Sequence, residues 1–517
     1  MGEILTVMSR RPAYAGLAAA LAILIVLPVV MAPHLLMLDA PAHEARLVVL
    51  RDLLITGHGS PFYVLDTLFI PNIAFDLVGL GLTAFVSPEE AGRIFFILVL
   101  LLTPSGIAVL NRIATGRWNL APLASVLLLY NLVSILGFYS FIFGLALVPW
   151  ALAGRLKLEA RAPVIGMMAG AGFSVLLLFC HLADFGIYAV MSAGFAVAAL
   201  RQGRIGIGQA LARALEPMPA GLLCLMMSTG SGSWISYDSN FLNAKLVGIL
   251  KALTSGSMAG DIAFVIGAVS FVLLLVFHAR PRLAASFIPG LAGLVVLYFA
   301  LPAKMASGSY VDIRLATAII FLALAGVNVQ FRPARMSFAL LALLVVAFVV
   351  KQSAITMLWR SFWAPASTIV HALDIVPRGA IIMQTGCLPD PRNIPDFYRM
   401  RQPAMQHLAS LSNFEGSRFV AASYAMPGQQ PVLASPSYRP YFSLQFDFGA
   451  TCEPFDYRDR VARIRALMQA EAMAGHAVPP LFFLLLRPPA ETNLQPAARL
   501  LSRGPDHLLY RIANPIE

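Results

Sequence analysis

The chain has 517 residues, of which 59% are hydrophobic and only 12% are charged. Soluble domains are about half apolar and about one quarter charged, so this composition excludes an ordinary soluble protein and predicts a polytopic α-helical membrane protein. The net charge of +11 would suggest nucleic-acid binding in a soluble chain. Here the basic residues lie in short connections between apolar runs, where they set the orientation of the spans, and we expect no nucleic-acid partner.

The first apolar run, residues 13–36, is predicted to be a membrane anchor, because no clear cleavage site follows it and many more apolar runs do. A polar segment, LDAPAHEARL at residues 38–47, comes directly after this run. It contains four ionisable residues, which are Asp39, His43, Glu44 and Arg46. Ionisable groups at a membrane boundary are candidates for function, so we interpret the segment as an active-site loop.

A second interpretation of the same segment is structural. Asp39 would cap a short helix that has Pro41 in its first turn, and Glu44 and Arg46 would lie on the solvated outer face of that helix. Capping explains Asp39 but not the neighbouring His43. The segment by itself leaves both interpretations open.

Apolar runs near the length needed to cross a bilayer recur through the first two thirds of the chain and predict about eleven spans. The predicted spans are residues 13–36, 93–111, 118–134, 136–153, 163–180, 182–200, 216–233, 259–278, 284–302, 312–330 and 336–357. The run at 71–86 is ambiguous, because counting it as a span would reverse every loop before it relative to every loop after it.

The distribution of charge resolves the run at 71–86. If this run lies flat on the membrane, the basic connections share one face, and they carry Arg10, Arg11, Arg112, Arg117, Arg155, Lys157, Arg161, Arg201, Arg204, Arg213, Arg280, Arg282, Arg332 and Arg335. The opposite face receives a first loop at 37–92, in which acidic residues outnumber basic ones. By the positive-inside rule we expect a cytoplasmic N-terminus, an extracytoplasmic first loop and interfacial helices near 42–56 and 62–86.

The same parity places three later segments outside the cytoplasm: the loop near 234–258, the turn at 303–312 and everything after the last span. His181 and Asp184 lie at a tight turn on this face, where we expect a buried polar pair that stabilises two helix ends. The charges of the spans lie at their ends, which argues against the intramembrane polar groups of an ion-coupled transporter.

The composition changes after residue 357, where the apolar runs shorten to the length of strands. The predicted strands are AIIMQTG, RFVAASYA, PLFFLLLR and HLLYRIAN. Because residues 457–475 have helical spacing, we divide the chain into a transmembrane domain, 1–357, and a small α/β domain, 358–517. Cys387 and Cys452 lie in this second domain and are expected to form a disulfide if it lies in an oxidising compartment.

The first part of the chain resembles the GT-C fold membrane glycosyltransferases, in particular the family-39-like enzymes that use polyprenyl-phosphate sugars. The similarity rests on the acidic segment at Leu38–Arg46, the proline-led stretch Pro71–Val86 and the sequence SPEEAGRI at Ser87–Ile94. Two features depart from the family pattern, since Ala40 stands where a second acidic residue is common and a basic residue after the third span is absent. The spacing of Asp, Pro, His and Arg in the acidic segment is similar to that of a divergent bacterial branch.

This resemblance implies a glycosyltransferase of the inner, cytoplasmic membrane, with a GT-C-like transmembrane domain embedded among membrane lipids and a periplasmic C-terminal domain. Such an enzyme takes a sugar from a polyprenyl-phosphate donor and transfers it to a lipid or glycan acceptor. Asp39 is then the expected general base. The expected substrate-binding neighbours of Asp39 are His43, Glu44 and Arg46.

The phosphate of such a donor requires positive charge, for which Arg314, Lys304 and Lys245 are candidates on the extracytoplasmic face. In the alternative interpretation the two lysines extend to the membrane interface, and Arg314 pairs with Asp312. We favour this alternative for the lysines and leave it open for Arg314.

No cofactor follows with certainty from the sequence. Asp39 and Glu44, together with His43, could hold a divalent cation such as Mg²⁺ or Mn²⁺, although three residues are too few to define a site. Two other classes of function stay open. One is a polytopic transporter, and the other is a non-catalytic membrane scaffold with an outer binding domain.

Overall fold

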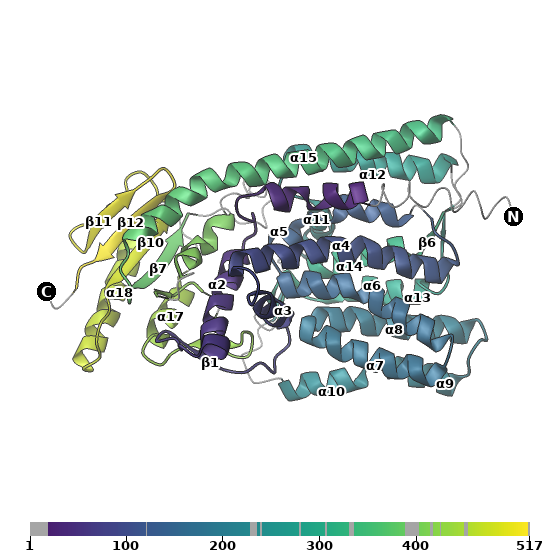
Figure 1. The fold of residues 1–517 in the computed structure, drawn as a ribbon, viewed down its shortest axis with the longest axis horizontal. Coiled ribbons are helices and arrows are strands. Elements are labelled where there is room, and N and C mark those ends of the chain that lie inside the picture. Colours follow the sequence, from purple (N-terminus) through teal and green to yellow (C-terminus); the bar gives the residue numbers. More distant parts are fainter. Residues whose placement is uncertain are drawn as a thin grey trace.

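The computed structural model of the protein describes residues 19–119, 121–227, 235–237, 240–278, 281–305, 308–329, 335–387, 403–413, 417–423, 425–448 and 453–514. Most of its helices lie side by side along the long axis of the molecule, and a mixed sheet lies at one end of them (Figure 1). The long helix α15 (Arg335–Ala372) runs along one side of these helices and leads into the sheet.

Seven helical segments of the described residues are long and apolar enough to cross a membrane. They are α4 (Pro88–Thr115), α6 (Tyr139–Glu159), α7 (Pro163–Cys180), α8 (Leu182–Arg201), the pair α9 (Ile207–Ala214) and α10 (Met218–Met227), α12 (Met258–His278) and α15. Shorter apolar helices are Ala19–Met31 and α13 (Ile288–Ala300). The predicted polytopic helical membrane protein is confirmed, whereas the total of about eleven spans stays a prediction.

The predicted span at 118–134 is not one continuous helix. The described residues of this run form the 3-10 helix η2 (Ala121–Leu128) and the short helix α5 (Leu132–Ile135). Asn131 interrupts the run, because its side chain accepts a hydrogen bond from the backbone N–H of Ser134 and caps α5. These residues are almost all buried, and irregular backbone is tolerated at membrane depth where protein surrounds it.

The predicted first loop contains helices α2 (Ala40–Arg51), η1 (Asp52–Thr56) and α3 (Ala74–Leu82). Together α2 and η1 match the helix expected near 42–56. The expected helix over 62–86 is wrong in its extent, since strand β1 (Tyr63–Leu65) lies near its start. Helix α3 has 9 residues and is roughly 14 Å long, so it is far too short to cross the roughly 30 Å of hydrocarbon.

Helix α4 begins at the sequence SPEEAGRI because Ser87 and Glu90 form a capping box. The N–H of Glu90 donates to Ser87 Oγ over 3.2 Å, and the N–H of Ser87 donates to Glu90 Oε2 over 3.1 Å. Pro88 occupies the first turn, where its missing N–H has no intrahelical partner to lose. The Arg93 guanidinium then donates to the Val29 carbonyl over 2.7 Å, which ties α4 to the first apolar helix.

The C-terminal part of the chain contains a five-stranded mixed sheet with the order β11-β12-β10-β7-β8. Its strands are β7 (Ile381–Gly386), β8 (Phe419–Val420), β10 (Leu481–Leu486), β11 (Ala498–Arg503) and β12 (His507–Ile512). Strands β8, β7 and β10 are parallel, whereas β12 is antiparallel to both β10 and β11. The helices beside the sheet are η4 (Pro403–Asn413), α17 (Arg439–Phe446) and α18 (Pro454–Met473). The predicted helix and the strands predicted in AIIMQTG, PLFFLLLR and HLLYRIAN are confirmed. Of RFVAASYA only Phe419–Val420 form a strand, and β11 was not predicted.

The remaining described elements are two helices and several short pieces. The helices are α11 (Phe241–Leu253) and α14 (Val311–Gly326), and the 3-10 turn η3 (Leu373–Ile375) follows α15. Strands β2 (Ile235–Ser236), β4 (Lys304–Met305) and β5 (Gly308–Ser309) form one small sheet, and β3 (Arg282–Leu283) pairs with β6 (Val327–Asn328).

The first loop and the C-terminal domain are packed together. Strand β1 pairs antiparallel with β9 (Val432–Ala434), and the Tyr63 hydroxyl donates to the Val420 carbonyl over 3.2 Å. Helix η4 packs against α2. Helix α15 also carries the chain past the predicted domain boundary at residue 357 without a break, and the boundary itself stays a prediction.

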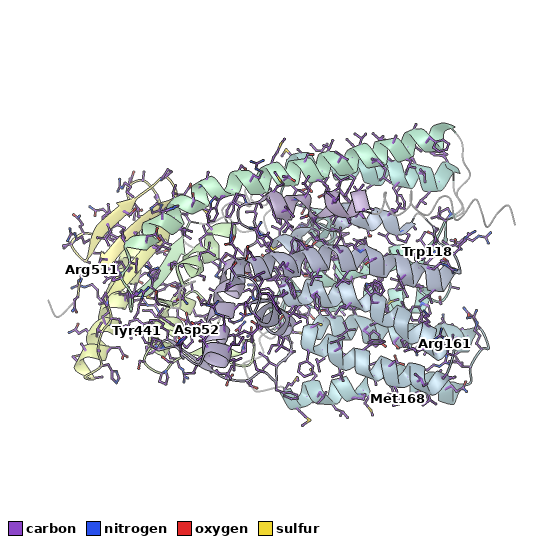
Figure 2. The ribbon with its side chains drawn as sticks, in the orientation of Figure 1. Asp52, Trp118, Arg161, Met168, Tyr441 and Arg511 are labelled. Atoms are coloured by element: carbon purple, nitrogen blue, oxygen red, sulfur yellow. The ribbon has the colours of Figure 1, made fainter. Side chains whose placement is uncertain are left out.

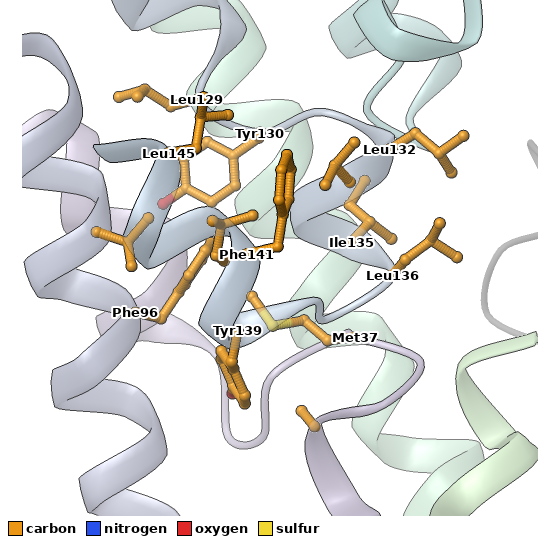
Figure 3. Packing of buried hydrophobic residues seen from close by; sticks show 14 of the residues in the cluster. Met37, Phe96, Leu129, Tyr130, Leu132, Ile135, Leu136, Tyr139, Phe141 and Leu145 are labelled. Carbon is orange, nitrogen blue, oxygen red and sulfur yellow. The ribbon is translucent and has the colours of Figure 1, made fainter. Parts of the chain in front are cut away.

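The hydrophobic core runs from the spanning helices into the base of the first loop. Met37 lies beside Leu136 and Tyr139 in this cluster (Figure 3). At the other end of the helices, Trp118 and Arg161 lie farthest from Arg511 of the sheet (Figure 2). The two basic connections near these residues therefore lie opposite the C-terminal domain, which is the relation that the charge pattern predicted.

Candidate active site at the start of helix α2

The backbone of Asp39 is fixed by the loop before α6. Its N–H donates to the Leu136 carbonyl over 3.2 Å. Gly137 has a φ of +77°, and a Cβ at this position would lie 3.1 Å from the Asp39 nitrogen, so only glycine allows this close approach. The Asp39 side chain makes no capping hydrogen bond to α2, and Glu44 and Arg46 are buried. The structure therefore contradicts the capping role of Asp39 and the solvated positions of Glu44 and Arg46, whereas the interpretation of the segment as an active-site loop stays a prediction.

Asp39 faces a histidine from the C-terminal domain. His407 lies on η4, and its Nε2 is 3.8 Å from Asp39 Oδ1. Both side chains are buried. This distance is too long for a hydrogen bond. Burial lowers the pKa of His407 to about 4, so its ring is neutral near pH 7.

Arg314 supplies a positive charge that interacts with Asp39. Its guanidinium carbon lies 4.2 Å from the centroid of the Phe138 ring, and its Nη1 is 2.8 Å from His181 Nε2. The carboxylates of both Asp39 and Asp184 interact electrostatically with this guanidinium. Arg314 is only 8% exposed, and its Nε has no hydrogen-bond partner within the described part of the chain.

The alternative pairing of Arg314 with Asp312 is wrong. Asp312 instead accepts from Lys245 Nζ over 2.9 Å, and the same ammonium group donates to the Leu301 carbonyl over 2.7 Å. Lys245 is buried, so the favoured interpretation that it extends to the membrane interface is also wrong. Lys304 lies on β4, opposite Ser309 of β5, and its role in binding phosphate stays a prediction.

His181 and Asp184 do not form the expected pair with each other. His181 Nδ1 accepts from the Ala183 N–H over 3.0 Å and so caps α8. Asp184 is fully buried, and among the described residues neither of its carboxylate oxygens has a hydrogen-bond partner. Both residues thus contribute to the surroundings of Arg314, one by direct contact and one by charge.

Arg46 and Asp76 form a buried, bidentate ion pair. Arg46 Nε donates to Asp76 Oδ1 over 2.6 Å, and Arg46 Nη2 donates to Asp76 Oδ2 over 3.1 Å. The same Nη2 lies 2.8 Å from His43 Nδ1. Burial and the nearby Arg46 charge lower the pKa of His43, which favours the neutral ring that can accept this hydrogen bond. The predicted binding of substrate by His43 and Arg46 stays a prediction.

Glu44 is fully enclosed on the opposite side of α2. The Tyr139 hydroxyl donates to Glu44 Oε1 over 3.3 Å, and His34 Nε2 lies 3.8 Å from Oε2. A Cβ at Gly92 would come within 2.6 Å of the same carboxyl, so the pocket around it is tight. Burial raises the pKa of Glu44 and favours the neutral acid.

Within the described ranges, no group of three or more His, Cys, Asp or Glu side chains is placed to hold a metal ion. The cation suggested for Asp39 and Glu44 stays a prediction, as does the role of Glu44 in binding substrate.

The predicted disulfide falls partly outside the described residues. Cys387, at the end of β7, is disulfide-bonded, and Cys180 and Cys224 are free. Cys452 lies outside the described residues, so the pairing of Cys387 with Cys452 stays a prediction.

Comparison with solved structures shows what this arrangement resembles. ArnT from Cupriavidus metallidurans in the apo state aligns with a TM-score of 0.50 over 97% of this chain and 98% of its own, at 11% identity. The chain has the fold of ArnT. ArnT bound to undecaprenyl phosphate aligns with a TM-score of 0.48 over 98% of this chain and 99% of its own, at 10% identity.

The mycobacterial arabinofuranosyltransferase AftD aligns with a TM-score of 0.47 and 13% identity, over 96% of this chain but only 40% of its own length. No protein-family model matches the chain, and no curated protein matches it. The resemblance to GT-C glycosyltransferases predicted from the first loop is confirmed at the level of the fold.

The sequence analysis did not assign two of the residues around Asp39 and Arg314 to the candidate site. His407 lies far from Asp39 in the sequence, in a segment without a clear helix or strand pattern. Asp184 was assigned to a helix end. The only available signal for Asp184 was a carboxylate next to a histidine at the end of an apolar run, since such a group is expensive to bury without a function.

Proposed function

We propose that this protein is a membrane glycosyltransferase that moves a sugar from a polyprenyl-phosphate donor to an extracytoplasmic acceptor, with Asp39 as the general base. The observation that supports this proposal best is the juxtaposition of Asp39 with Arg314 in a buried site. Glycosyl transfer from a phosphate needs both charges, one to take a proton and one to stabilise the leaving group. The ArnT-like fold supports the same class.

In the proposed reaction the hydroxyl oxygen of the acceptor bonds to the anomeric carbon of the donor sugar. The bond between that carbon and the phosphate oxygen breaks, and the electron pair stays with the phosphate. Asp39 takes the proton of the acceptor hydroxyl as the new bond forms. The Arg314 guanidinium stabilises the charge on the departing phosphate, and its planar group suits two phosphate oxygens.

The donor class and the orientation belong to the same proposal. Undecaprenyl phosphate is the lipid bound to ArnT, and we extend a lipid phosphate of this kind to the present chain. We place the N-terminus in the cytoplasm and the first loop and C-terminal domain in the periplasm, since the basic connections predict this orientation. His43, Arg46, Glu44 and Lys304 would then border the donor or the acceptor.

A transfer assay with an Asp39→Asn variant tests the base. Wild-type protein is reconstituted in liposomes with a panel of undecaprenyl-phosphate sugars and an envelope extract that supplies acceptors, and release of undecaprenyl phosphate is measured by mass spectrometry. Because a missing general base costs at least roughly 100-fold, Asp39→Asn is expected to be almost inactive while keeping the wild-type melting temperature.

Asp52→Asn is the matched control, because Asp52 lies in the same loop (Figure 2). Within the described residues its carboxylate forms one ion pair, with the neighbouring Arg51 over 3.8 Å. Full activity of Asp39→Asn would refute the role of Asp39. A wild-type protein that binds the lipid phosphate but releases none from any donor, with every acceptor extract, would instead favour a transporter or a scaffold.

A further inference from the structure

A cavity of about 320 Å³ lies in the C-terminal domain, at the carboxyl ends of the parallel strands. Residues 384–386 end β7 and line it, Leu486 ends β10 and lines it, and residues 421–423 follow β8 directly and line it. Ligands of α/β sheets bind outside the carboxyl ends of parallel strands. The volume is also within the range of about 300–1,000 Å³ typical of small-molecule sites.

The chemistry of the cavity wall is neutral and amide-rich. Glutamine side chains at five positions line it, and these are Gln384, Gln406, Gln429, Gln430 and Gln445. The described lining residues include no Asp, Glu, Lys or Arg. An amide carries both a donor and an acceptor, which suits a hydroxyl group that also does both, whereas a phosphate or carboxylate ligand would call for a charged partner.

The side chain of Gln384 has a buried acceptor that a ligand can use. Its Nε2 donates to the Gln406 carbonyl, which fixes the orientation of the amide. Its Oε1 is buried and has no hydrogen-bond partner in the part of the chain that the structure describes, and the residue is only 5% exposed. A buried acceptor without a donor is unfavourable, so this oxygen is prepared for a donor that a ligand brings.

Aromatic rings form another part of the wall. Phe442, Phe446 and Phe448 line the cavity, and Phe446 is 65% exposed at its rim. The negative face of an aromatic ring attracts polarised C–H groups, which a pyranose presents on one side while its hydroxyls point outward. Amides and aromatic rings together are therefore complementary to a neutral sugar.

The cavity adjoins the site of Asp39. His407 lines the cavity, and its Nε2 is 3.8 Å from Asp39 Oδ1. One histidine thus forms part of the wall of the cavity and part of the surroundings of the carboxylate. A molecule bound in the cavity would reach the carboxylate past this ring.

We propose that this cavity binds a neutral sugar residue of the acceptor, so that the group receiving the transferred sugar is a hydroxyl of a glycan. The assignment of this sugar to the acceptor rests on the proposed function. The binding of a saccharide is independent of that function, because it follows from the lining of the cavity alone.

Saturation-transfer NMR on the full-length protein in detergent tests this binding. The probes are the methyl α-glycosides of glucose, galactose and mannose, with glycerol 3-phosphate as a charged probe of similar polarity. At least one glycoside is expected to give saturation transfer and glycerol 3-phosphate none. Gln384→Met should weaken glycoside binding about tenfold, since it removes the buried acceptor at nearly constant volume.

Phe446→Ala should weaken binding roughly threefold to tenfold, and because the Phe446 side chain is exposed, its removal leaves the packing of the core unchanged. Phe455→Ala is the matched control, because Phe455 is 76% exposed and lies outside the cavity lining. Asp39→Asn should retain wild-type glycoside binding even where it abolishes transfer.

Absence of saturation transfer from every glycoside would overturn the proposal, and so would binding that is unchanged in both cavity variants. Either result is compatible with wild-type transfer activity, so it leaves the glycosyltransferase proposal standing. Conversely, glycoside binding without any transfer would refute that function and keep the saccharide site.

Discussion

His407 and Asp39 face each other across 3.8 Å, although they lie far apart in the sequence. The distance between Nε2 and Oδ1 is longer than a hydrogen bond, and a small movement of either side chain would bring it within hydrogen-bond range. The site is therefore complete only when η4 is packed against α2. This contact makes the C-terminal domain a part of the site.

Replacing His407 should change how stability depends on pH. Burial lowers its pKa to about 4 from the ordinary value of 6.5, so between these values the unfolded state binds the proton that the native state rejects. The free energy of unfolding therefore falls as the pH drops from 6.5 towards 4, by about 3 kcal/mol at most. His407→Gln should be less sensitive to acid across this window in thermal melts.

His58→Gln serves as the control for this measurement, because His58 lies in the same part of the structure as β1 but is exposed. An acid sensitivity of His407→Gln equal to that of the wild type would show that the ring does not stay neutral in the native state.

Glu44 should contribute a dependence of the opposite sign. Burial raises its pKa above the ordinary value of 4.5, so the native state holds the proton more tightly than the unfolded state does. The free energy of unfolding therefore falls as the pH rises above 4.5 and stops falling once the native acid has ionised. Glu44→Gln keeps a neutral side chain of the same shape and should raise the melting temperature above this pH.

Thermal melts of Glu44→Gln and the wild type from pH 4 upward provide the test. Glu90→Gln would not be a suitable comparison because Glu90 belongs to the capping box, whereas Glu491→Gln changes an exposed carboxylate and is suitable. A Glu44→Gln variant that is less stable than the wild type at every pH would mean that Glu44 is ionised in the folded protein.

Arg314→Gln should weaken the binding of a lipid phosphate. The guanidinium is buried beside Asp39 and keeps its Nε without a hydrogen-bond partner among the described residues, so a phosphate oxygen can use it. Loss of one charge-assisted contact predicts roughly tenfold weaker binding of undecaprenyl phosphate, measured by native mass spectrometry of detergent-solubilised protein.

Arg463→Gln is the control for charge, since the Arg463–Asp447 pair is exposed. Equal affinity of the Arg314→Gln and Arg463→Gln variants for undecaprenyl phosphate would remove Arg314 from the phosphate site.

The Arg46–Asp76 pair should be structural. Asp76→Leu would leave the Arg46 guanidinium buried without its counter-charge, and breaking a buried pair in this way costs about 3–5 kcal/mol. The double variant Arg46→Met with Asp76→Leu should recover much of this loss, because it removes both charges. Chemical denaturation in detergent compares the single and double variants. A double variant no more stable than Asp76→Leu would contradict the assignment.

The sequence predicted the elements that local patterns determine. The helix near 42–56, the helix over 457–475 and strands such as PLFFLLLR follow from short-range signals, and the structure contains each of them. The alternative in which Arg314 pairs with Asp312 rested on their proximity in sequence, whereas Lys245 from α11 reaches Asp312 in the folded chain. Partners that come from distant elements carry no local signal.

The prediction of a continuous span at 118–134 was wrong for a different reason. Its composition satisfies the length and hydropathy of a span, yet its described residues form the 3-10 helix η2 and the short helix α5, which Asn131 caps. Almost all of these residues are buried, and irregular backbone is tolerated at membrane depth where protein surrounds it. Hydropathy reports that a segment avoids water and does not report whether lipid or protein surrounds it.

The pairing of β1 with β9 has a mechanical consequence. The C-terminal part of the chain is joined to the rest of the molecule through the unbroken helix α15 and through the pairing of its strand β9 with β1 of the first loop. Two such attachments prevent it from swinging as a free body on a single tether. A truncated chain that stops after α15 would therefore leave β1 with an unpaired edge and is expected to aggregate rather than to behave as a smaller enzyme.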